Sequence, residues 1–209
     1  VIDPAGSHQP MSTPDGSLTI AFNGEIYNFR QLRSELADSG VRFQTAGDTE
    51  VLLHLYQRDG AEMVRRLRGM FAFVVHDANA GCLLLARDPL GQKPLWYAPL
   101  GDRIVFASEA KALLAHAAVN AATATQAITA YLTMGYNPAP LTIWQGIRKL
   151  LPGHTLSVTD RCDTPRTYWR PLPAAAPRSH AEAVESVRRA LGQSVRAHLV
   201  SDVPLGALL

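Results

Sequence analysis

The sequence predicts an α+β fold, in which antiparallel sheets covered by helices are followed by the start of a parallel α/β unit. Short apolar, β-prone runs separated by turn residues dominate the first part of the chain, which is typical of hairpins. Segments with helical apolar spacing stand between these runs, as expected of helices that cover sheets. A linker then precedes a long amphipathic helix and an apolar run, the order in which an α/β unit begins. We therefore expect one domain over residues 1–171 and part of a second over residues 172–209.

The composition is that of an ordinary globular protein. The chain has 209 residues, of which 47% are hydrophobic and 18% charged, and its formal net charge is +2. These values allow a real core and favour a folded chain over a disordered one. The one basic cluster, residues 65–68, has no interleaved aromatic residues, so we interpret it as a solvated helix face and expect no nucleic-acid partner.

Two absences bear on where the protein acts. No apolar run is long enough to span a bilayer and no signal peptide opens the chain, so we expect no membrane partner. The two cysteines, Cys82 and Cys162, show neither metal-ligand spacing nor a disulfide framework. We therefore expect no metal site within this chain and a cytoplasmic location.

The first expected elements surround a polar interruption. Residues 18–22 alternate and are β-prone, and residues 23–25 break this strand. A helix then begins at Asn28, with Gln31 completing a capping box, and Gly40 ends it.

Further elements follow in order. Residues 41–45 are expected to form a strand, and a helix follows Asp48 and ends at Gly60. Four apolar runs then predict two hairpins, over residues 70–77, 82–87, 95–98 and 103–107, the second turning at residues 101 and 102. We expect short helices over residues 109–115 and 125–134, a loop-rich stretch over residues 136–153, and late strands over residues 154–159 and 167–169.

The chain changes character near residue 172. Three prolines and three alanines within residues 171–177 indicate a linker. Ser179 and Glu182 form a capping box for a helix that runs to about Leu199. Its apolar residues recur at helical spacing: Val184, Val187, Leu191, Val195 and Leu199. Residues 204–209 look like the opening of a buried strand.

The first polar interruption carries a chemical pattern. Asn23-Gly24 alone is a favoured hairpin turn, but here a helix follows instead of a returning strand. An Asn side-chain amide and a Gly backbone N–H at a strand end can also form an oxyanion hole, because glycine has no Cβ to block the substrate. Glu25 would then offer a carboxylate to a substrate amine.

Two other polar stretches are open to both structural and functional interpretations. Asp48 in the string GDTE suits a helix N-cap, and the same position can meet a ligand ammonium group. Residues 86–95 suit a tight connection held by the charges of Arg87, Asp88 and Lys93, which we favour over a catalytic role.

These stretches together resemble the glutamine-hydrolysing asparagine synthetase family, over a class II glutamine amidotransferase domain and the start of the synthetase domain. The resemblance covers essentially the whole chain in order. It rests on the strings FNGEIYN (22–28), GDTE (47–50), LRGMFAF (67–73), ARDPLGQKPL (86–95), FASEAKAL (106–113), PGH (152–154) and SDVPLG (201–206).

The resemblance implies an N-terminal nucleophile fold, a four-layer αββα sandwich of two antiparallel sheets between helices. Its nucleophile is a cysteine at the mature N-terminus, and Asn23 and Gly24 match the oxyanion hole. Glu25 and Asp48 match residues that hold the glutamine amino group. Val1 and Ile2 match a segment whose backbone lines the glutamine site, and Leu209 matches an ATP contact.

The same resemblance implies the overall reaction. Ammonia from glutamine passes to a second domain, where ATP and Mg²⁺ activate a carboxylate, typically that of aspartate. Neither cysteine of this chain matches the nucleophile, and the pyrophosphate loop would follow Leu209. The chain is therefore interpreted as a fragment, and we expect no activity from it alone, because loss of a nucleophile costs roughly 10⁶ in turnover.

Two other functions are kept as alternatives. A related enzyme could amidate another carboxylate, or close a β-lactam ring with ATP, and the acceptor pocket would lie beyond this chain. A non-catalytic glutamine-binding domain is a minor alternative, because a chain that stops within a buried strand would expose an apolar edge. The oligomeric state is not specified by the sequence, and a homodimer is kept beside a monomer.

Overall fold

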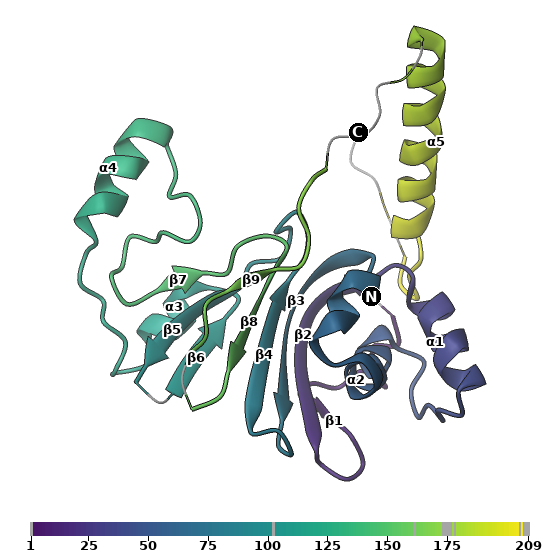
Figure 1. Ribbon diagram of the computed structural model, residues 1–209, viewed down its shortest axis with the longest axis horizontal. Helices are drawn as coiled ribbons and strands as arrows, with labels where there is room; N and C mark the ends of the chain where they lie inside the picture. Colours follow the sequence, from purple (N-terminus) through teal and green to yellow (C-terminus); the bar gives the residue numbers. More distant parts are fainter. Residues whose placement is uncertain are drawn as a thin grey trace.

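The computed structural model describes residues 2–101, 103–160, 162–172, 177, 179–204 and 206 (Figure 1). The larger of two sheets contains β1 (Met11–Ser12), β2 (Leu18–Ile26), β3 (Gly69–Asp77), β4 (Cys82–Arg87), β8 (His154–Val158) and β9 (Arg166–Thr167), side by side in that order. The smaller sheet has the order β6 (Arg103–Ala107), β5 (Trp96–Leu100) and β7 (Arg148–Lys149). Every strand pair in both sheets is antiparallel.

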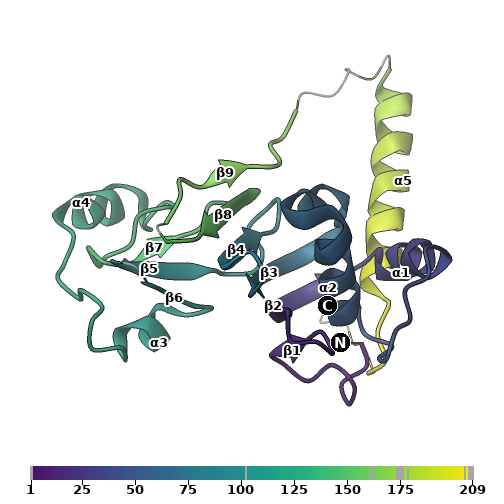
Figure 2. The same ribbon diagram turned by 60° about the horizontal axis from the view of Figure 1, so that its bottom comes forward.

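The helices lie outside the two sheets. They are α1 (Phe29–Asp38), α2 (Asp48–Asp59), α3 (Ala110–Leu114), α4 (Thr125–Met134) and α5 (His180–His198), with a 3₁₀ helix at Gly60–Arg66. Figure 2 shows α1 and α2 together at one end of the molecule and α3 and α4 at the other. None of the helices in the described ranges is both long and apolar enough to cross a bilayer.

Alternation along β3 explains how the layers are built. Phe71, Phe73 and Val75 point into a core shared with α1 and α2, because alternate side chains leave opposite faces of a strand. Ala72 and Val74 point the other way, into a core shared with β5 and β8.

A third core lies between the smaller sheet and α3. The layers are thus helix, sheet, sheet and helix, which confirms the predicted α+β sandwich.

The first strand does not end where the sequence suggested. β2 continues to Ile26, since Asn23, Gly24 and Glu25 pair with Ala72, Phe71 and Met70 of β3. A Cβ on Gly24 would lie 2.1 Å from the carbonyl oxygen of Met70. The expected break at residues 23–25 is therefore wrong: glycine serves here to let two strands approach closely, and not to turn the chain.

The capping box expected at Asn28 is also wrong. Asn28 precedes α1, but its side chain makes no capping hydrogen bond. It instead donates to the carbonyl oxygen of Arg66 at 2.9 Å and accepts from the N–H of Arg68 at 2.9 Å. Gln31 donates to Glu35 on the helix surface. The Asn28 amide thus joins the start of α1 to the segment that leads into β3.

Residues 41–45 do not form the expected strand. The N–H groups of Gln44 and Thr45 donate to the two carboxylate oxygens of Glu50, each at 2.7 Å. Because these donors are satisfied by a side chain of α2, the segment needs no neighbouring strand.

The other expected elements are present, with ends shifted by a few residues. The late strand expected at residues 167–169 is β9, and Ser179 caps α5 by accepting from the N–H of Glu182 at 3.1 Å. Residues 102, 205 and 207–209 lie outside the described residues, so the expected turn at residue 102 and strand at 204–209 are mostly not described.

Candidate functional site

A pocket of about 260 Å³ lies where the end of β2 meets the start of α2. It contains four of the residues singled out from the sequence, Ile2, Gly24, Glu25 and Asp48. Its other lining residues are Pro4, Ser7, Gln9, Phe22 and Thr49. Val1 and Leu209, also expected at ligand sites, lie outside the described residues.

The edge of β2 directs its backbone donors toward this pocket. The N–H and C=O of Phe71 both bond to Asp88, so Gly24, opposite Phe71, stands in a non-hydrogen-bonded pair. Its N–H therefore points away from β3. The N–H groups of Phe22 and Ile26, two residues before and after it, leave the strand on the same edge.

Side chains hold both of these flanking donors. The N–H of Phe22 donates to Oε1 of Gln9 at 2.5 Å, and that of Ile26 donates to Oδ2 of Asp48 at 2.9 Å. Gln9 and Asp48 both line the pocket, so the N–H of Gly24 lies between two occupied positions and faces the pocket. Of these three N–H groups, that of Gly24 is the one that points into the pocket. Only glycine fits at this position, because a Cβ would collide with the carbonyl oxygen of Met70.

Asp48 is the most perturbed acid at the site. Only 5% of the residue is exposed. Burial raises the pKa of its carboxyl group to about 6, and the nearby Glu25 carboxylate contributes in the same direction. Asp48 is the first residue of α2 and Gly47 is the N-cap, so the expected N-cap role of Asp48 is wrong.

Glu25 and Asp48 together make the pocket attractive to a cation. They approach it from β2 and α2 respectively. The charge of Glu25 also raises the pKa of Tyr27, after the larger effect of burial. Two carboxyl groups whose fields overlap in a partly buried pocket favour a positively charged ligand such as an ammonium group.

Asn23 lies at a second pocket beside β2. It lines an adjoining pocket of about 190 Å³ with Ser108, and its Nδ2 donates to the Ser108 hydroxyl oxygen at 3.4 Å. Gln9 and Phe22 line both pockets. The structure therefore brings Asn23 next to the Gly24–Glu25–Asp48 group without placing it in the same cavity.

Behind the site, Asp88 organises the connection after β4. It is fully buried, and its carboxylate accepts backbone hydrogen bonds at 2.9–3.3 Å. The four donors are the N–H groups of Phe71, Leu90, Gln92 and Lys93. Through Phe71, which lies opposite Gly24, this carboxylate supports the strand that forms the site.

Arg87 completes the same connection. Its guanidinium donates to the carbonyl oxygens of Lys93, Leu150 and Gly91 at 2.7–2.8 Å. The expected tight connection over residues 86–95 is present, and Lys93 joins it through its backbone.

Neither cysteine lies at this pocket. Cys82 pairs with Asp77, whereas Glu25 pairs with Met70, so seven residues of β3, roughly 23 Å of strand, separate the two positions. Cys162 packs against the core between the sheets. Among the described residues no group of three or more His, Cys, Asp or Glu side chains could hold a metal ion.

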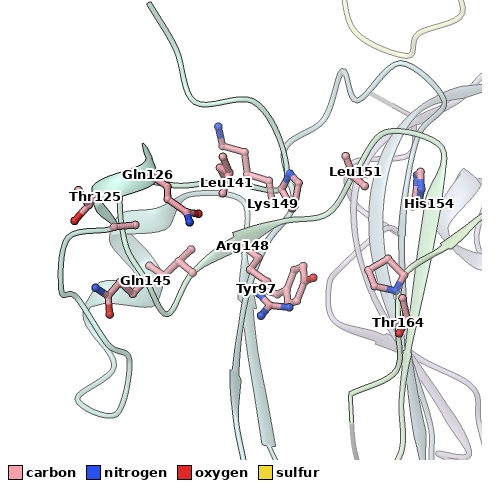
Figure 3. A pocket seen from close by; sticks show the side chains of 14 residues that line it. Tyr97, Thr125, Gln126, Leu141, Gln145, Arg148, Lys149, Leu151, His154 and Thr164 are labelled. Carbon is pink, nitrogen blue, oxygen red and sulfur yellow. The ribbon is translucent and has the colours of Figure 1, made fainter. Parts of the chain in front are cut away.

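A larger pocket lies elsewhere among the described residues. It has a volume of about 640 Å³ beside α4 and β7 (Figure 3). Two of its polar side chains already have protein partners: Lys149 donates to the carbonyl oxygen of Asn137, and both ring nitrogens of His154 lie within 2.9 Å of Pro152 or Thr167 oxygens. None of the residues that the sequence assigned to a ligand lines it, so we place the functional site at β2 and α2.

Comparisons with known proteins show the family of the chain. Residues 1–169 match a family model described as a glutamine amidotransferase domain. Asparagine synthetase [glutamine-hydrolyzing] 1 of Bacillus subtilis is 38% identical over 210 residues, covering 100% of this chain and 33% of that relative. An amidase of Penicillium rubens is 32% identical over 208 residues, covering 97% of this chain and 30% of that relative.

A solved structure is also similar. Glutamine phosphoribosylpyrophosphate amidotransferase of B. subtilis has 26% identity and a TM-score of 0.52, over 94% of this chain and 42% of the other. The chain spans about a third of the length of the curated relatives it matches.

Proposed function

The chain belongs to the glutamine amidotransferase domain family, and we propose that it binds and helps to hydrolyse glutamine in an enzyme that makes asparagine from aspartate. The observation that carries this proposal is the convergence of Glu25, Asp48 and the N–H of Gly24 on one pocket. Two carboxyl groups suit the ammonium group of an amino acid, and the directed N–H suits a developing oxyanion.

The ammonium group of glutamine is proposed to bind between Glu25 and Asp48. Asp48 must be ionised for this, and the incoming positive charge would lower its raised pKa. The backbone of Val1 and Ile2 is proposed to line the same site, and Ile2 does border the pocket.

Asn23 and Gly24 are proposed to hold the oxyanion that forms when the glutamine carboxamide is attacked. Gly24 would donate its backbone N–H. The Asn23 amide nitrogen carries two hydrogens, so it can donate one to Ser108 and the other to the oxyanion. Each such donor is typically worth roughly 10²–10³ in rate.

The attacking group is proposed to be a cysteine thiolate, as the family resemblance implies, and neither Cys82 nor Cys162 borders the pocket. ATP with Mg²⁺ would supply the activation of the acceptor carboxylate. The described residues hold no suitable metal cluster, so we assign none of them to that ion, and Leu209 is kept as the proposed ATP contact.

The test is an assay of the full-length protein with glutamine, aspartate and Mg-ATP. We expect equal amounts of glutamate and asparagine, and glutamate release that depends on Asp48 and Glu25. Absence of glutamate release would overturn the proposed use of glutamine.

A second candidate is amidation of another carboxylate, kept because one relative of similar identity bears a name other than asparagine synthetase, the Penicillium amidase. Two results of the same assay would favour this candidate. Glutamate would be released without formation of asparagine, and another amide would form when other carboxylic acids are offered.

A further inference from the structure

The segment that follows α5 returns to the wall of the glutamine pocket. Oδ2 of Asp202 accepts a hydrogen bond of 2.9 Å from the backbone N–H of Asp3, across 199 residues of sequence. Asp3 directly follows Ile2, which lines the pocket. We propose that Asp202 is a positioning residue for glutamine binding, an inference that rests on the function proposed above.

Asp3 has an unfavourable backbone conformation that neighbouring hydrogen bonds must stabilise. Its φ of +46° makes it the one residue other than glycine with positive φ among the described residues. Its carboxylate accepts from the N–H of Gly6 at 2.9 Å and from that of Ala46 at 2.8 Å. Its carbonyl oxygen accepts from the N–H of Ser7 at 3.0 Å. A left-handed residue persists where surrounding bonds over-determine it, and Asp202 supplies the remaining bond, to the N–H.

Asp3 connects the two sides of the pocket. On one side it continues into Ile2, and on the other its carboxylate holds Ala46, two residues before Asp48. The loop also packs tightly on the start of α2, since a Cβ on Gly47 would lie 2.1 Å from the Ser7 hydroxyl oxygen. Movement of Asp3 would therefore shift Ile2 relative to Asp48, and so change the width of the site.

Two further contacts bring Asp202 to this position. The ring of His198, the last residue of α5, lies 4.2 Å from the ring of Tyr27, two residues after Glu25. Val200 packs against the core beneath α1 and α2. Figures 1 and 2 both show the C-terminal end of α5 next to α1 and the N-terminal residues. Asp202 thus contacts Asp3 as the end of a docked segment.

The contact gives the second part of the chain a means to affect the first. Asp202 belongs to the string SDVPLG, which lies on the far side of the linker from the pocket. When this segment is docked, Asp3 is held and the pocket is formed. When it is displaced, one of the bonds that hold Asp3 is lost and glutamine binds more weakly.

The test measures glutamine KM and kcat for Asp202→Ala and Asp202→Asn in the full-length protein. Loss of one ordinary hydrogen bond predicts a rise of about three- to tenfold in KM for Asp202→Ala, with kcat little changed. Asp202→Asn keeps an acceptor oxygen and should recover most of the affinity. Synthesis from added ammonia, which bypasses the glutamine pocket, should be unchanged in both and reports correct folding.

Glu185→Ala is the matched control, because it removes an exposed carboxylate of α5 that pairs with Arg188 and is remote in sequence from Asp202. Equal KM values for Asp202→Ala and this control would overturn the inference while leaving the proposed function intact. If the unsubstituted protein does not hydrolyse glutamine, the proposed function fails. The positioning role of Asp202 is then measured by amide hydrogen exchange of residues 2–7. This exchange should be about three- to tenfold faster in Asp202→Ala. Unchanged exchange would exclude the positioning role.

Discussion

The carboxylate of Asp48, at the start of α2, accepts a 2.9 Å hydrogen bond from the backbone N–H of Ile26, at the end of β2. This bond satisfies the edge N–H of β2 next to Gly24, and it holds the Asp48 carboxyl group in a buried position. Structure and function make opposite demands on that acid. Burial favours its neutral form, whereas an ammonium ligand requires its charge.

Glutamine binding should therefore depend on pH through Asp48. Its pKa of about 6 in the free protein means that roughly nine-tenths of the molecules carry a neutral Asp48 at pH 5. We expect the dissociation constant for glutamine to rise about tenfold between pH 8 and pH 5, measured by calorimetry. The dependence should vanish in Asp48→Asn, and a flat profile in the unsubstituted protein would contradict the role of Asp48.

Asp48→Asn should also stabilise the protein while weakening glutamine binding. The folded pKa of Asp48 is raised above its ordinary value of 3.8, so the carboxyl group costs stability as the pH rises from about 4 to about 6. An amide keeps an acceptor for Ile26 without the charge. At pH 8 we expect a gain of about 1–3 kcal/mol in the free energy of unfolding, and no gain at pH 3.5. A loss of stability at pH 8 would show that the charged form is favoured by the fold.

Asn23→Ala should lower kcat for glutamine hydrolysis by roughly 10²–10³ with a small change in KM, because the amide acts on the oxyanion and not on bound glutamine. Ser108→Ala is the comparison: it removes the partner of Asn23 and keeps the amide. A decrease confined to KM in Asn23→Ala would place this residue at the substrate and not at the transition state.

Gly24→Ala should destabilise the protein by about 2–4 kcal/mol, since its Cβ would meet the carbonyl oxygen of Met70 at 2.1 Å. Gly206→Ala is a matched control, because a Cβ there meets nothing within 4 Å. Thermal unfolding of the two variants gives the comparison, and similar midpoints would mean that β2 and β3 can separate at this point without cost.

Asp88→Ala should lower the free energy of unfolding by about 3–5 kcal/mol, because it leaves buried N–H donors around the connection after β4 without their acceptor. Asp15→Ala serves as the control, since that carboxylate is exposed and its hydrogen bonds are to Thr13 and Ser17 of its own turn. Denaturant unfolding measures both, and a cost below about 1 kcal/mol for Asp88→Ala would show that water replaces the carboxylate.

Cys82→Ser and Cys162→Ser should leave glutamine hydrolysis by the full-length protein unchanged within about twofold, because neither thiol lies at the pocket. Steady-state rates at saturating glutamine test this directly. A loss of more than 100-fold in either variant would identify that thiol as the nucleophile and displace the proposed site.

Apolar periodicity predicted most elements of the fold. The spacing of Val184, Val187 and Leu191 indicated α5, and the continuous apolar run of β3 reflects burial on both faces. It failed at residues 23–25, which pair with residues 70–72 of β3, and at residues 41–45, where the carboxylate of Glu50 accepts from the N–H groups of Gln44 and Thr45. Residues 23–25 form a strand although they contain an Asn-Gly pair, and residues 41–45 form none although they are β-prone. In both segments the available hydrogen-bond partners override local propensity.

The sequence by itself determined the chemical groups of the site and the family to which the chain belongs, because the strings around Asn23-Gly24-Glu25 and Asp48 carry both. Only the tertiary structure decided how these groups are arranged. Antiparallel register turned the N–H of Gly24 toward the pocket, and the fold placed Asn23 in an adjoining pocket, next to Ser108. The bond from Asp3 to Asp202 spans 199 residues, and no local pattern encodes it, because such contacts form only when the folded chain brings both ends together.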